Sequence, residues 1–422
     1  MHESLLTLLR CPFCGTRLSL VDNHALVRQG TAIVTAVLGC ECCAFPVVDG
    51  IPVLMADDTS RAAIVALEAG RASQARDLLL GLDEARSATL DALLARDRHA
   101  TYRELIDVLS PDAEGTYFIY RFSDPTFVMA EGILRALGQH TATTAQWVID
   151  VCGGSGHLTR VLMQVQTAGA SPGPGVVVAD VSFAKLWLAA HLTAPGCHPV
   201  CCDANHPLPL ASNAFSMAVL SDAFPYIWHK RLLAGELLRL AGPDGVVVMP
   251  HLHSSLGWNH SAGMPLTPAA YADLFAPLQP RLFRDGDLLT SVLDHDVVDL
   301  ARSVTAADMA AENSLTLVAS RDGSLFREHR LPAAARVNGA IVVNPLYAVA
   351  QHGAGSTLTL TFPTPEYADE FGGCRRYLPD LLDLPADLTG PLDPVALEAA
   401  LGVDYASLRH RRVLIDAPPH YC

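Results

Sequence analysis

The chain has 422 residues, of which 50% are hydrophobic and 17% are charged, and its formal net charge is −15. This composition is that of a folded protein with a large core, and the length suggests about two to four structural units. The sequence has no run of about 18 apolar residues that would span a membrane. Its acidic balance argues against broad binding to nucleic acid, which needs a positive surface. The first residues also lack a basic segment followed by an apolar stretch, so we expect a cytoplasmic protein.

The N-terminal region contains two pairs of closely spaced cysteines. Cys11-Pro-Phe-Cys14 and Cys40-Glu-Cys-Cys43 each form a knuckle that aims two thiolates at one point, and two knuckles complete a closed tetrahedral zinc site. We therefore predict one structural zinc ion held by Cys11, Cys14, Cys40 and Cys43. Cys42 is the spare thiol, because only Cys43 keeps the two-residue gap from Cys40. Four buried thiols without an ion are the alternative.

The stretches LLRCPFCGTRL and LGCECCAFPVVDGIPVLM add a resemblance. They resemble the small zinc-ribbon family whose members activate methyltransferases, in which a Tyr/Phe-Pro-x-x-Asp-Gly-Ile-Pro-x-Leu run follows the second knuckle. Residues 45–54 match that run. The resemblance implies a zinc ribbon that accompanies a methyltransferase.

The periodicity of the chain changes after the ribbon. Between 59 and 140, Ala and Leu recur at spacings of three and four, which predicts helices. In the last of these, SDPTFVMAEGILRALG, Ser123 or Asp124 is the expected cap, Pro125 lies near the first turn and Gly138 marks the end. From 146 to 250, the apolar stretches WVIDV, GVVVAD, HPVCCD, FSMAVLS and GVVVMP alternate with helices, which predicts a parallel sheet buried on both faces.

The first of these strands leads into a Gly-rich loop, VIDVCGGSGH, at 148–157. A dinucleotide loop reads G-x-G-x-x-G and places a pyrophosphate at a helix N-terminus, but here Thr159 stands where the third glycine would be. Asp150 ends the strand, and its carboxylate would repel a pyrophosphate but suits an ammonium group. The loop therefore favours S-adenosylmethionine. Cys152 takes the place of the first glycine, and we interpret it as a tolerated small side chain rather than a catalytic thiol.

Acidic residues also end the next two strands, Asp180 in VVVAD and Asp203 in CCDANHPLPL. With the loop and the stretches LPLASNAFSMAVLSDAFPYI and LLRLAGPDGVVVM, they resemble class I S-adenosylmethionine-dependent methyltransferases over roughly 146–250. Ser216 departs from that family by replacing its usual Asp. Asp180 is placed to accept hydrogen bonds from the ribose, and the resemblance implies that Asp203 meets the adenine amino group. The expected cofactor-binding residues are Asp150, Cys152, Gly153, Gly154, Ser155, Gly156, Asp180, Val181, Asp203, Ala204 and Ser221.

These observations predict an α/β protein built on a doubly wound, Rossmann-like methyltransferase sheet. We expect a zinc ribbon over 1–58, a helical linker or cap over 59–140 and the cofactor-binding core over 141–255. Residues 256–422 are expected to complete the sheet and to add a C-terminal α+β region that contacts substrate or acts as a lid.

Histidines gather directly after the fifth strand, in MPHLHSSLGWNHSAGMPL. His251 and His253 are two residues apart on an expected extended segment, so their side chains should share a face. We expect one of them, His253 or His251, to act as a base or substrate anchor, with Tyr226 from the segment after the fourth strand. A second metal site that uses both histidines and His260, with the run Asp-His-Asp at 294–296, is an alternative.

The acidic surface and the large C-terminal region favour a small-molecule acceptor such as a sugar, a natural product or a carrier-bound intermediate. An RNA or protein methyltransferase is the second hypothesis. The third is a partner subunit that binds the cofactor without catalysis. The sequence is also compatible with a homo-oligomer, and it predicts no membrane partner.

Overall fold

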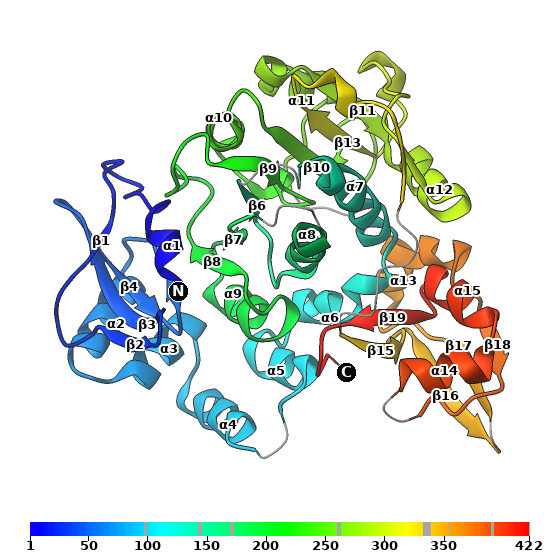
Figure 1. Ribbon diagram of the computed structural model, residues 1–422, viewed down its shortest axis with the longest axis horizontal. Helices are drawn as coiled ribbons and strands as arrows, with labels where there is room; N and C mark the ends of the chain where they lie inside the picture. Colours follow the sequence, from blue (N-terminus) through cyan, green and yellow to red (C-terminus); the bar gives the residue numbers. More distant parts are fainter. Residues whose placement is uncertain are drawn as a thin grey trace.

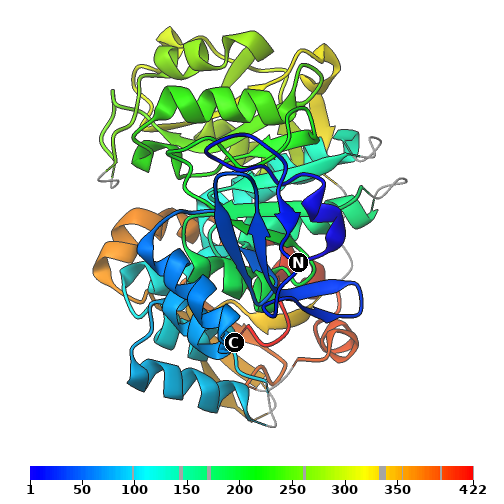
Figure 2. The same ribbon diagram turned by 90° about the vertical axis from the view of Figure 1, so that its left-hand side faces the viewer.

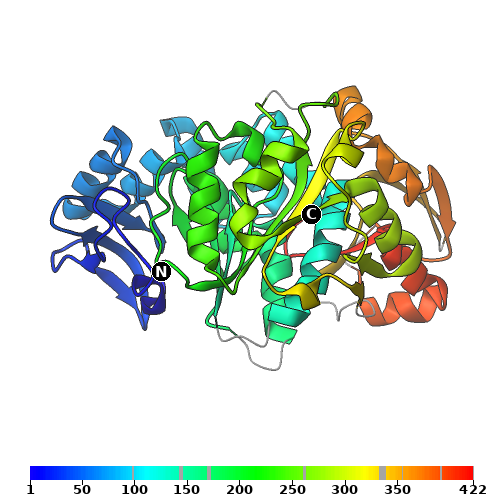
Figure 3. The same cartoon turned by 90° about the horizontal axis from the view of Figure 1, so that it is seen from above.

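The computed structural model describes residues 1–96, 99–141, 146–168, 173–259, 263–331, 339–353, 355–389 and 392–421. Figure 1 shows an N-terminal module, a central sheet and a C-terminal part, and the view from above places the first and the last of these at opposite ends of the molecule (Figure 3). Among these residues, no helix combines the length and the apolar character needed to cross a membrane.

The N-terminal module is an antiparallel sheet in which β1, β3, β4 and β5 are neighbours and β2 pairs with β3. Its elements are α1 (Glu3–Leu6), β1 (Ser19–Leu20), β2 (Val27–Gln29), β3 (Ala32–Gly39), β4 (Ala44–Val48) and β5 (Ile51–Pro52). Asp49 and Gly50 form the turn from β4 to β5 with φ of 48° and 77°, the left-handed conformation that two-residue hairpin turns need. Asp49 also accepts a hydrogen bond from Trp187 Nε1 at 3.0 Å. The Leu54 amide donates to the Cys201 carbonyl at 2.7 Å, so the module is joined to the edge of the central sheet.

Helices follow the module, and Figure 2 shows the first of them packed beneath its sheet. They are α2 (Asp58–Glu68), α3 (Ala72–Leu80), α4 (Glu84–Leu94), α5 (Tyr102–Leu109), α6 (Ala113–Tyr120), the short η1 (Arg121–Ser123) and α7 (Pro125–Thr141). Asp124 caps α7 by accepting the Phe127 amide at 2.6 Å. The expected end of this helix at Gly138 is wrong, because the helix continues to Thr141. Gly138 serves close packing instead, since a Cβ there would lie 2.1 Å from Cγ1 of Val165 in α8 (His157–Ala168).

The central sheet has the order β11-β13-β10-β9-β6-β7-β8. Its strands are β6 (Trp147–Val151), β7 (Val176–Asp180), β8 (His198–Cys201), β9 (Phe215–Val219), β10 (Val246–His253), β11 (Pro280–Arg284) and β13 (Ser314–Ala319). The five strands expected between 146 and 250 form and pair in parallel. β13 runs antiparallel to both β10 and β11. Along β6, Val148 belongs to one buried apolar cluster and Ile149 to another, so both faces of the sheet are covered. The predicted doubly wound, Rossmann-like fold class is confirmed.

Helices α8, α9 (Phe183–Leu188), α10 (Lys230–Ala241), α11 (Pro268–Leu274) and α12 (Asp285–His295) accompany this sheet, with the short η2 (Ala189–Thr193), η3 (Phe224–Tyr226) and η4 (Ala276–Leu278). The winding direction reverses between β6 and β9, because β7 and β8 extend the sheet to one side of β6 and β9 and β10 extend it to the other. Ligands of such sheets bind outside the carboxyl ends of the strands at this reversal.

The C-terminal part adds two small sheets and short helices. One sheet has the order β16-β17-β18 and the other pairs β15 with β19, while β12 pairs with β14. The elements are β12 (Val297–Asp299), η5 (Ala307–Met309), η6 (Gly323–Leu325), β14 (Glu328–Arg330), β15 (Ala340–Val343), β16 (Tyr347–His352), β17 (Gly355–Leu360), α13 (Pro365–Phe371), η7 (Gly372–Arg376), β18 (Leu381–Leu384), α14 (Pro394–Leu401), α15 (Asp404–His410) and β19 (Leu414–Ala417).

Candidate functional site

A cavity of about 670 Å³ lies at the carboxyl ends of β6, β7, β8 and β9. The residues that end or follow these strands line one side of it: Asp150, Cys152, Gly153, Gly154, Asp180, Val181, Asp203, Ala204, Asn205, Ser221, Asp222, Ala223, Tyr226 and Ile227. α6, Arg121 and α13 supply further lining residues, namely Glu114, Thr116, Tyr117, Phe118, Glu366, Tyr367, Glu370 and Phe371. The cavity therefore joins the Gly-rich loop to the helical segment and to the C-terminal part.

Two of the expected cofactor residues, Ser155 and Gly156, do not line this cavity. Ser155 is fully buried and accepts a hydrogen bond from Tyr102 Oη at 2.7 Å. A Cβ on Gly156 would lie 2.8 Å from the Cβ of Ala189, so this glycine brings the loop against η2. Both residues shape the loop from behind.

The backbone of the Gly-rich loop explains its composition. Cys152, Gly154 and Gly156 all have positive φ, of 57°, 54° and 82°. A Cβ on Gly153 would lie 2.8 Å from the Asp150 carboxyl, which only glycine avoids. Cys152 is thus a non-glycine residue in a left-handed conformation. Burial and the charge of Asp180 raise the pKa of its thiol well above the usual value, so the reactive thiolate is disfavoured.

The two acids next to the loop have different environments. Asp150 is 1% exposed and accepts a hydrogen bond from Thr159 Oγ1 at 2.7 Å. Burial outweighs this bond and, with the nearby charge of Asp180, raises the pKa of Asp150 to about 7. Asp180 accepts the Gly154 and Ser182 amides, each at 2.9 Å. It therefore holds the loop in place, and burial raises its pKa.

Asp203 is the third expected acid, and its side chain is more exposed to solvent than those of Asp150 and Asp180. Its Oδ1 accepts the backbone amide of Asn205 at 2.8 Å and Nδ2 of the same residue at 2.9 Å. The exposed fraction of its side chain is 33%. Three carboxylates thus follow three neighbouring parallel strands along one side of the cavity.

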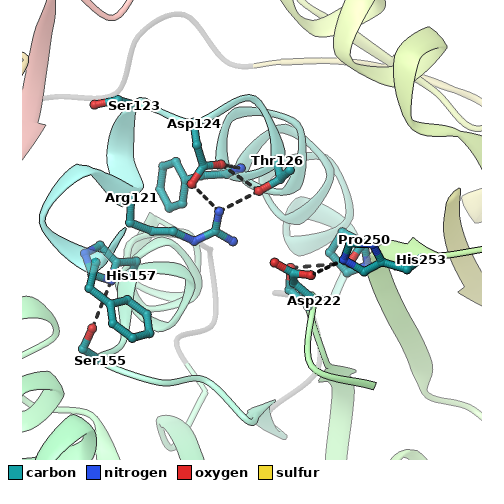
Figure 4. A network of polar contacts seen from close by, with 12 residues as sticks. Arg121, Ser123, Asp124, Thr126, Ser155, His157, Asp222, Pro250 and His253 are labelled. Carbon is teal, nitrogen blue, oxygen red and sulfur yellow. Dashed lines mark hydrogen bonds and ion pairs between the residues drawn. The ribbon is translucent and has the colours of Figure 1, made fainter. Parts of the chain in front are cut away.

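Arg121, in η1, is a cavity residue that the sequence did not single out. Its Nη1 donates to Asp124 Oδ2 at 2.5 Å and to Thr126 Oγ1 at 2.7 Å, and its guanidinium lies 5.3 Å from the centre of the Tyr117 ring. Figure 4 shows its other terminal nitrogen directed towards Asp222. An Arg that precedes a helix cap has no sequence signature, so only the fold reveals this cation in the cavity wall.

The expected histidines lie beside the cavity at the end of β10. His253 Nε2 lies 2.9 Å from Asp222 Oδ1 (Figure 4), and the rings of His251 and His253 are 4.9 Å apart. Neither histidine lines the cavity, whereas Asp222 does. The two side chains lie together as expected, but not on a regular extended backbone: His251 has φ of 57°, and the pairing of β10 with β13 shifts register between Met249 and Leu252. This bulge, rather than a regular strand, sets the direction of the histidine side chains.

His251 is oriented by Asp285, the first residue of α12. Its Nδ1 lies 2.9 Å from Asp285 Oδ2, and Thr316 Oγ1 donates to Asp285 Oδ1 at 2.8 Å. Burial alone would lower the pKa of His251, but the bond to Asp285 and the charge of Asp222 raise it to about 9. His251 is therefore a cation at neutral pH when nothing else is bound. No pattern in the sequence pointed to Asp285, which the order of the strands brings past β13 to the end of β10.

Other expected acceptor-side residues have different positions. Tyr226 lines the cavity and is 55% exposed, so it lies at the mouth. His260 lies outside the described residues. Asp294 pairs with Arg376 at 2.7 Å and Asp296 with His410 at 3.4 Å. The expected contribution of 294–296 to a metal site with the histidines is therefore wrong.

Four N-terminal thiols converge, but Cys42 takes the place that was expected for Cys43. The Sγ atoms of Cys11, Cys14, Cys40 and Cys42 all lie within 4.8 Å of one another. The expected fourth ligand, Cys43, is not in this group, although its Sγ lies 3.4 Å from that of Cys42. The Cys40 amide donates to the Cys43 carbonyl at 3.0 Å, which closes a two-residue turn and leaves Cys42 at the tip, against the first knuckle. Four thiols this close are the donor set that zinc prefers.

Comparisons with known proteins add the following findings. No family model matches the chain, and no curated protein matches it. Among solved structures, an S-adenosylmethionine-dependent methyltransferase from Aquifex aeolicus is 16% identical, covers 48% of this chain and 96% of its own, and has a TM-score of 0.32. One from Mesorhizobium loti is 15% identical over 42% of this chain and 91% of its own, with a TM-score of 0.31. A complex from Haloferax volcanii that contains the Trm112 methyltransferase activator is 16% identical over 44% of this chain and 89% of its own, with a TM-score of 0.30.

Proposed function

We propose that this chain transfers the methyl group of S-adenosylmethionine to a small-molecule acceptor. The observation that carries the proposal is the row of Asp150, Asp180 and Asp203 around one cavity, with a pKa near 7 at the buried Asp150. A carboxyl group with so raised a pKa lacks a cationic partner. An ammonium group supplies that partner, and a pyrophosphate would make the repulsion worse. The three carboxylates of the cavity therefore fit this cofactor better than a dinucleotide.

Each residue has a role in this proposal. Asp150 faces the ammonium group, Asp180 accepts from the ribose hydroxyls and Asp203 accepts from the adenine amino group. The backbone around Cys152, Gly153 and Gly154 lines the cavity and would pass along the cofactor. Ser155 and Gly156 support the loop from behind, while Val181, Ala204 and Ser221 complete the cavity wall. Arg121 is placed to bind a carboxylate group at the opposite wall.

When bound, S-adenosylmethionine supplies an electrophilic methyl group. The chain must then orient an acceptor and remove its proton. In the proposal the acceptor lies between Asp222 and α13, the cluster of Asp222, His251 and His253 activates it, and Tyr226 contacts it at the mouth. Because α6 and α13 also line the cavity and narrow the space beside the sheet, a small acceptor fits better than a folded RNA.

We also propose that Cys11, Cys14, Cys40 and Cys42 hold one structural zinc ion in a ribbon of residues 1–58. A closed four-thiolate site leaves no position for substrate, and the cysteines lie in a module of their own. This ion would therefore stabilise the module and its contact with β8 rather than take part in the reaction.

Binding experiments test the proposal. Calorimetry with S-adenosylhomocysteine is expected to show one site per chain, and Asp180→Ala is expected to weaken it strongly. Asp77→Ala is a matched control, because this acid lies on α3 and pairs with Arg76 away from the cavity. No binding to the wild-type protein would overturn the assignment of the cofactor. Retention on transfer or ribosomal RNA that falls steeply with salt would favour an RNA acceptor instead.

A further inference from the structure

The cluster of Asp222, His251 and His253 has the composition of a metal site. One potential ligand atom from each residue lies within 4.8 Å of the others. Two imidazoles and one carboxylate are a donor set used by divalent transition metals such as Mn²⁺, Fe²⁺, Co²⁺ and Zn²⁺. Ligands at about 2.1 Å from an ion and at right angles to one another are about 3.0 Å apart. Asp222 Oδ1 and His253 Nε2 are 2.9 Å apart.

The surroundings of the cluster leave its ligand atoms available. Asp285 accepts from Nδ1 of His251 and is itself held by Thr316, so Nε2 of His251 is the ring nitrogen left for an ion, which would bind there in exchange for a proton. A carboxylate behind a histidine is the usual outer partner of a metal-binding imidazole.

The backbone supports the same interpretation. Asp222 and His251 have φ of 58° and 57°, a conformation that non-glycine residues rarely adopt and that clusters at functional sites. The bulge in β10 adds a second irregularity at the same place. Two strained residues, one in the loop after β9 and one in β10, thus direct their side chains into one cluster.

Charge and access also favour a cation. Two carboxylates, Asp222 and Asp285, flank the two imidazoles, and the nearby Arg121 is paired with Asp124. The side chain of Asp222 is 29% exposed and that of His251 is 18% exposed. Asp222 lines the acceptor side of the cavity, so an ion in the cluster would keep open positions towards the acceptor.

We propose that Asp222, His251 and His253 bind a divalent transition-metal ion that coordinates the acceptor through neighbouring oxygen atoms. Coordination lowers the pKa of an acceptor hydroxyl group, whose proton is then released to water. The acceptor class is therefore a small molecule with two adjacent oxygen donors, such as a pair of hydroxyls or a hydroxyl beside a carbonyl. The assignment of the acceptor rests on the proposed methyl transfer, whereas the ion site itself does not.

Mn²⁺ is the probe of choice, because it is bound poorly by thiolates and will not report on the N-terminal cysteines. The full-length protein, treated with a chelator, is titrated with MnCl₂ and followed by electron paramagnetic resonance. One site per chain is expected. The substitutions Asp222→Asn and His251→Asn introduce asparagine, which tolerates positive φ. Together with His253→Gln, they remove the proposed ligands one at a time. Each is expected to weaken Mn²⁺ binding more than Asp285→Asn, which should weaken it about 10- to 100-fold. His352→Ala, at an exposed histidine on β16, is the matched control and should bind like the wild type.

Equal Mn²⁺ affinity in the wild type and the three ligand variants, or no Mn²⁺ binding at all, would overturn the ion site. Circular dichroism of each variant shows that loss of binding is not loss of fold. Catechol is expected to change the spectrum of the bound Mn²⁺ and phenol is not; an unchanged spectrum with catechol would overturn the acceptor class. Calorimetry with S-adenosylhomocysteine on the same samples separates the two proposals, because failure of the ion site leaves that binding intact.

Discussion

The buried carboxyl group of Asp150 makes cofactor binding depend on pH. Its pKa is about 7 in the free protein, and an ammonium group beside it would return the pKa towards the usual carboxylate value of about 3.9. The cofactor then binds the ionised form. With a pKa near 7, about half of the protein is ionised at pH 7 and about 1% at pH 5. Affinity should therefore fall about 50-fold between pH 7 and pH 5, which corresponds to about 2.3 kcal/mol.

Calorimetry with S-adenosylhomocysteine at several pH values measures this change. Repeating the titration at pH 7 in buffers with different ionisation enthalpies should show release of about half a proton for each cofactor bound. Asp150→Asn cannot ionise, so its affinity should be weaker at pH 7 and nearly constant down to pH 5. A wild-type profile that parallels the Asp150→Asn profile would refute the placement of the ammonium group at this carboxylate.

The raised pKa of Asp150 also makes the stability of the free protein depend on pH. Because the folded state holds the Asp150 proton more tightly than the unfolded chain, this group contributes stability at low pH that is lost as the pH rises from about 4 to about 7. The loss is on the order of 4 kcal/mol for a shift of about three pKa units. Denaturation with urea should show Asp150→Asn free of this decline, and bound cofactor should reduce it in the wild type.

Three further predictions concern other parts of the molecule. Asp180→Ala removes the acceptor of two ribose hydrogen bonds and releases the Gly-rich loop, and it should weaken cofactor binding at least about 100-fold by calorimetry; unchanged affinity would contradict the role of Asp180. Cys42→Ser should lose zinc by metal analysis while Cys43→Ser keeps about one ion per chain, and the reverse result would restore the ligand set expected from spacing. Tyr421→Phe should lower the free energy of unfolding by about 1–3 kcal/mol, because it removes the hydroxyl that lies 2.8 Å from the buried Nε2 of His157. An unfolding free energy equal to that of the wild type would show that water satisfies His157.

The parallel strands of the central sheet and the position of its acids could be predicted because both follow from local patterns. Apolar runs such as WVIDV identify buried parallel strands, and an acid at the end of such a run must lie at the ligand edge.

What could not be predicted depends on contacts between distant residues or on an irregular backbone. Asp285 reaches His251 only because β13 and β11 are added after β10 in the sheet. The bulge at His251 is not encoded by a residue pattern, and the same holds for the turn that brings Cys42 rather than Cys43 to the other thiols. Spacing rules assume regular geometry, so they do not anticipate these two irregular turns.

The most direct test of the proposed function is a calorimetric competition on the full-length protein at pH 7.5 with S-adenosylhomocysteine and NAD. S-adenosylhomocysteine is expected to bind at one site per chain and to lose affinity in Asp150→Asn and Asp180→Ala, while NAD should not bind. Binding of NAD at the same site, or S-adenosylhomocysteine affinity that is insensitive to both substitutions, would contradict the assignment of this cavity to the methyl donor.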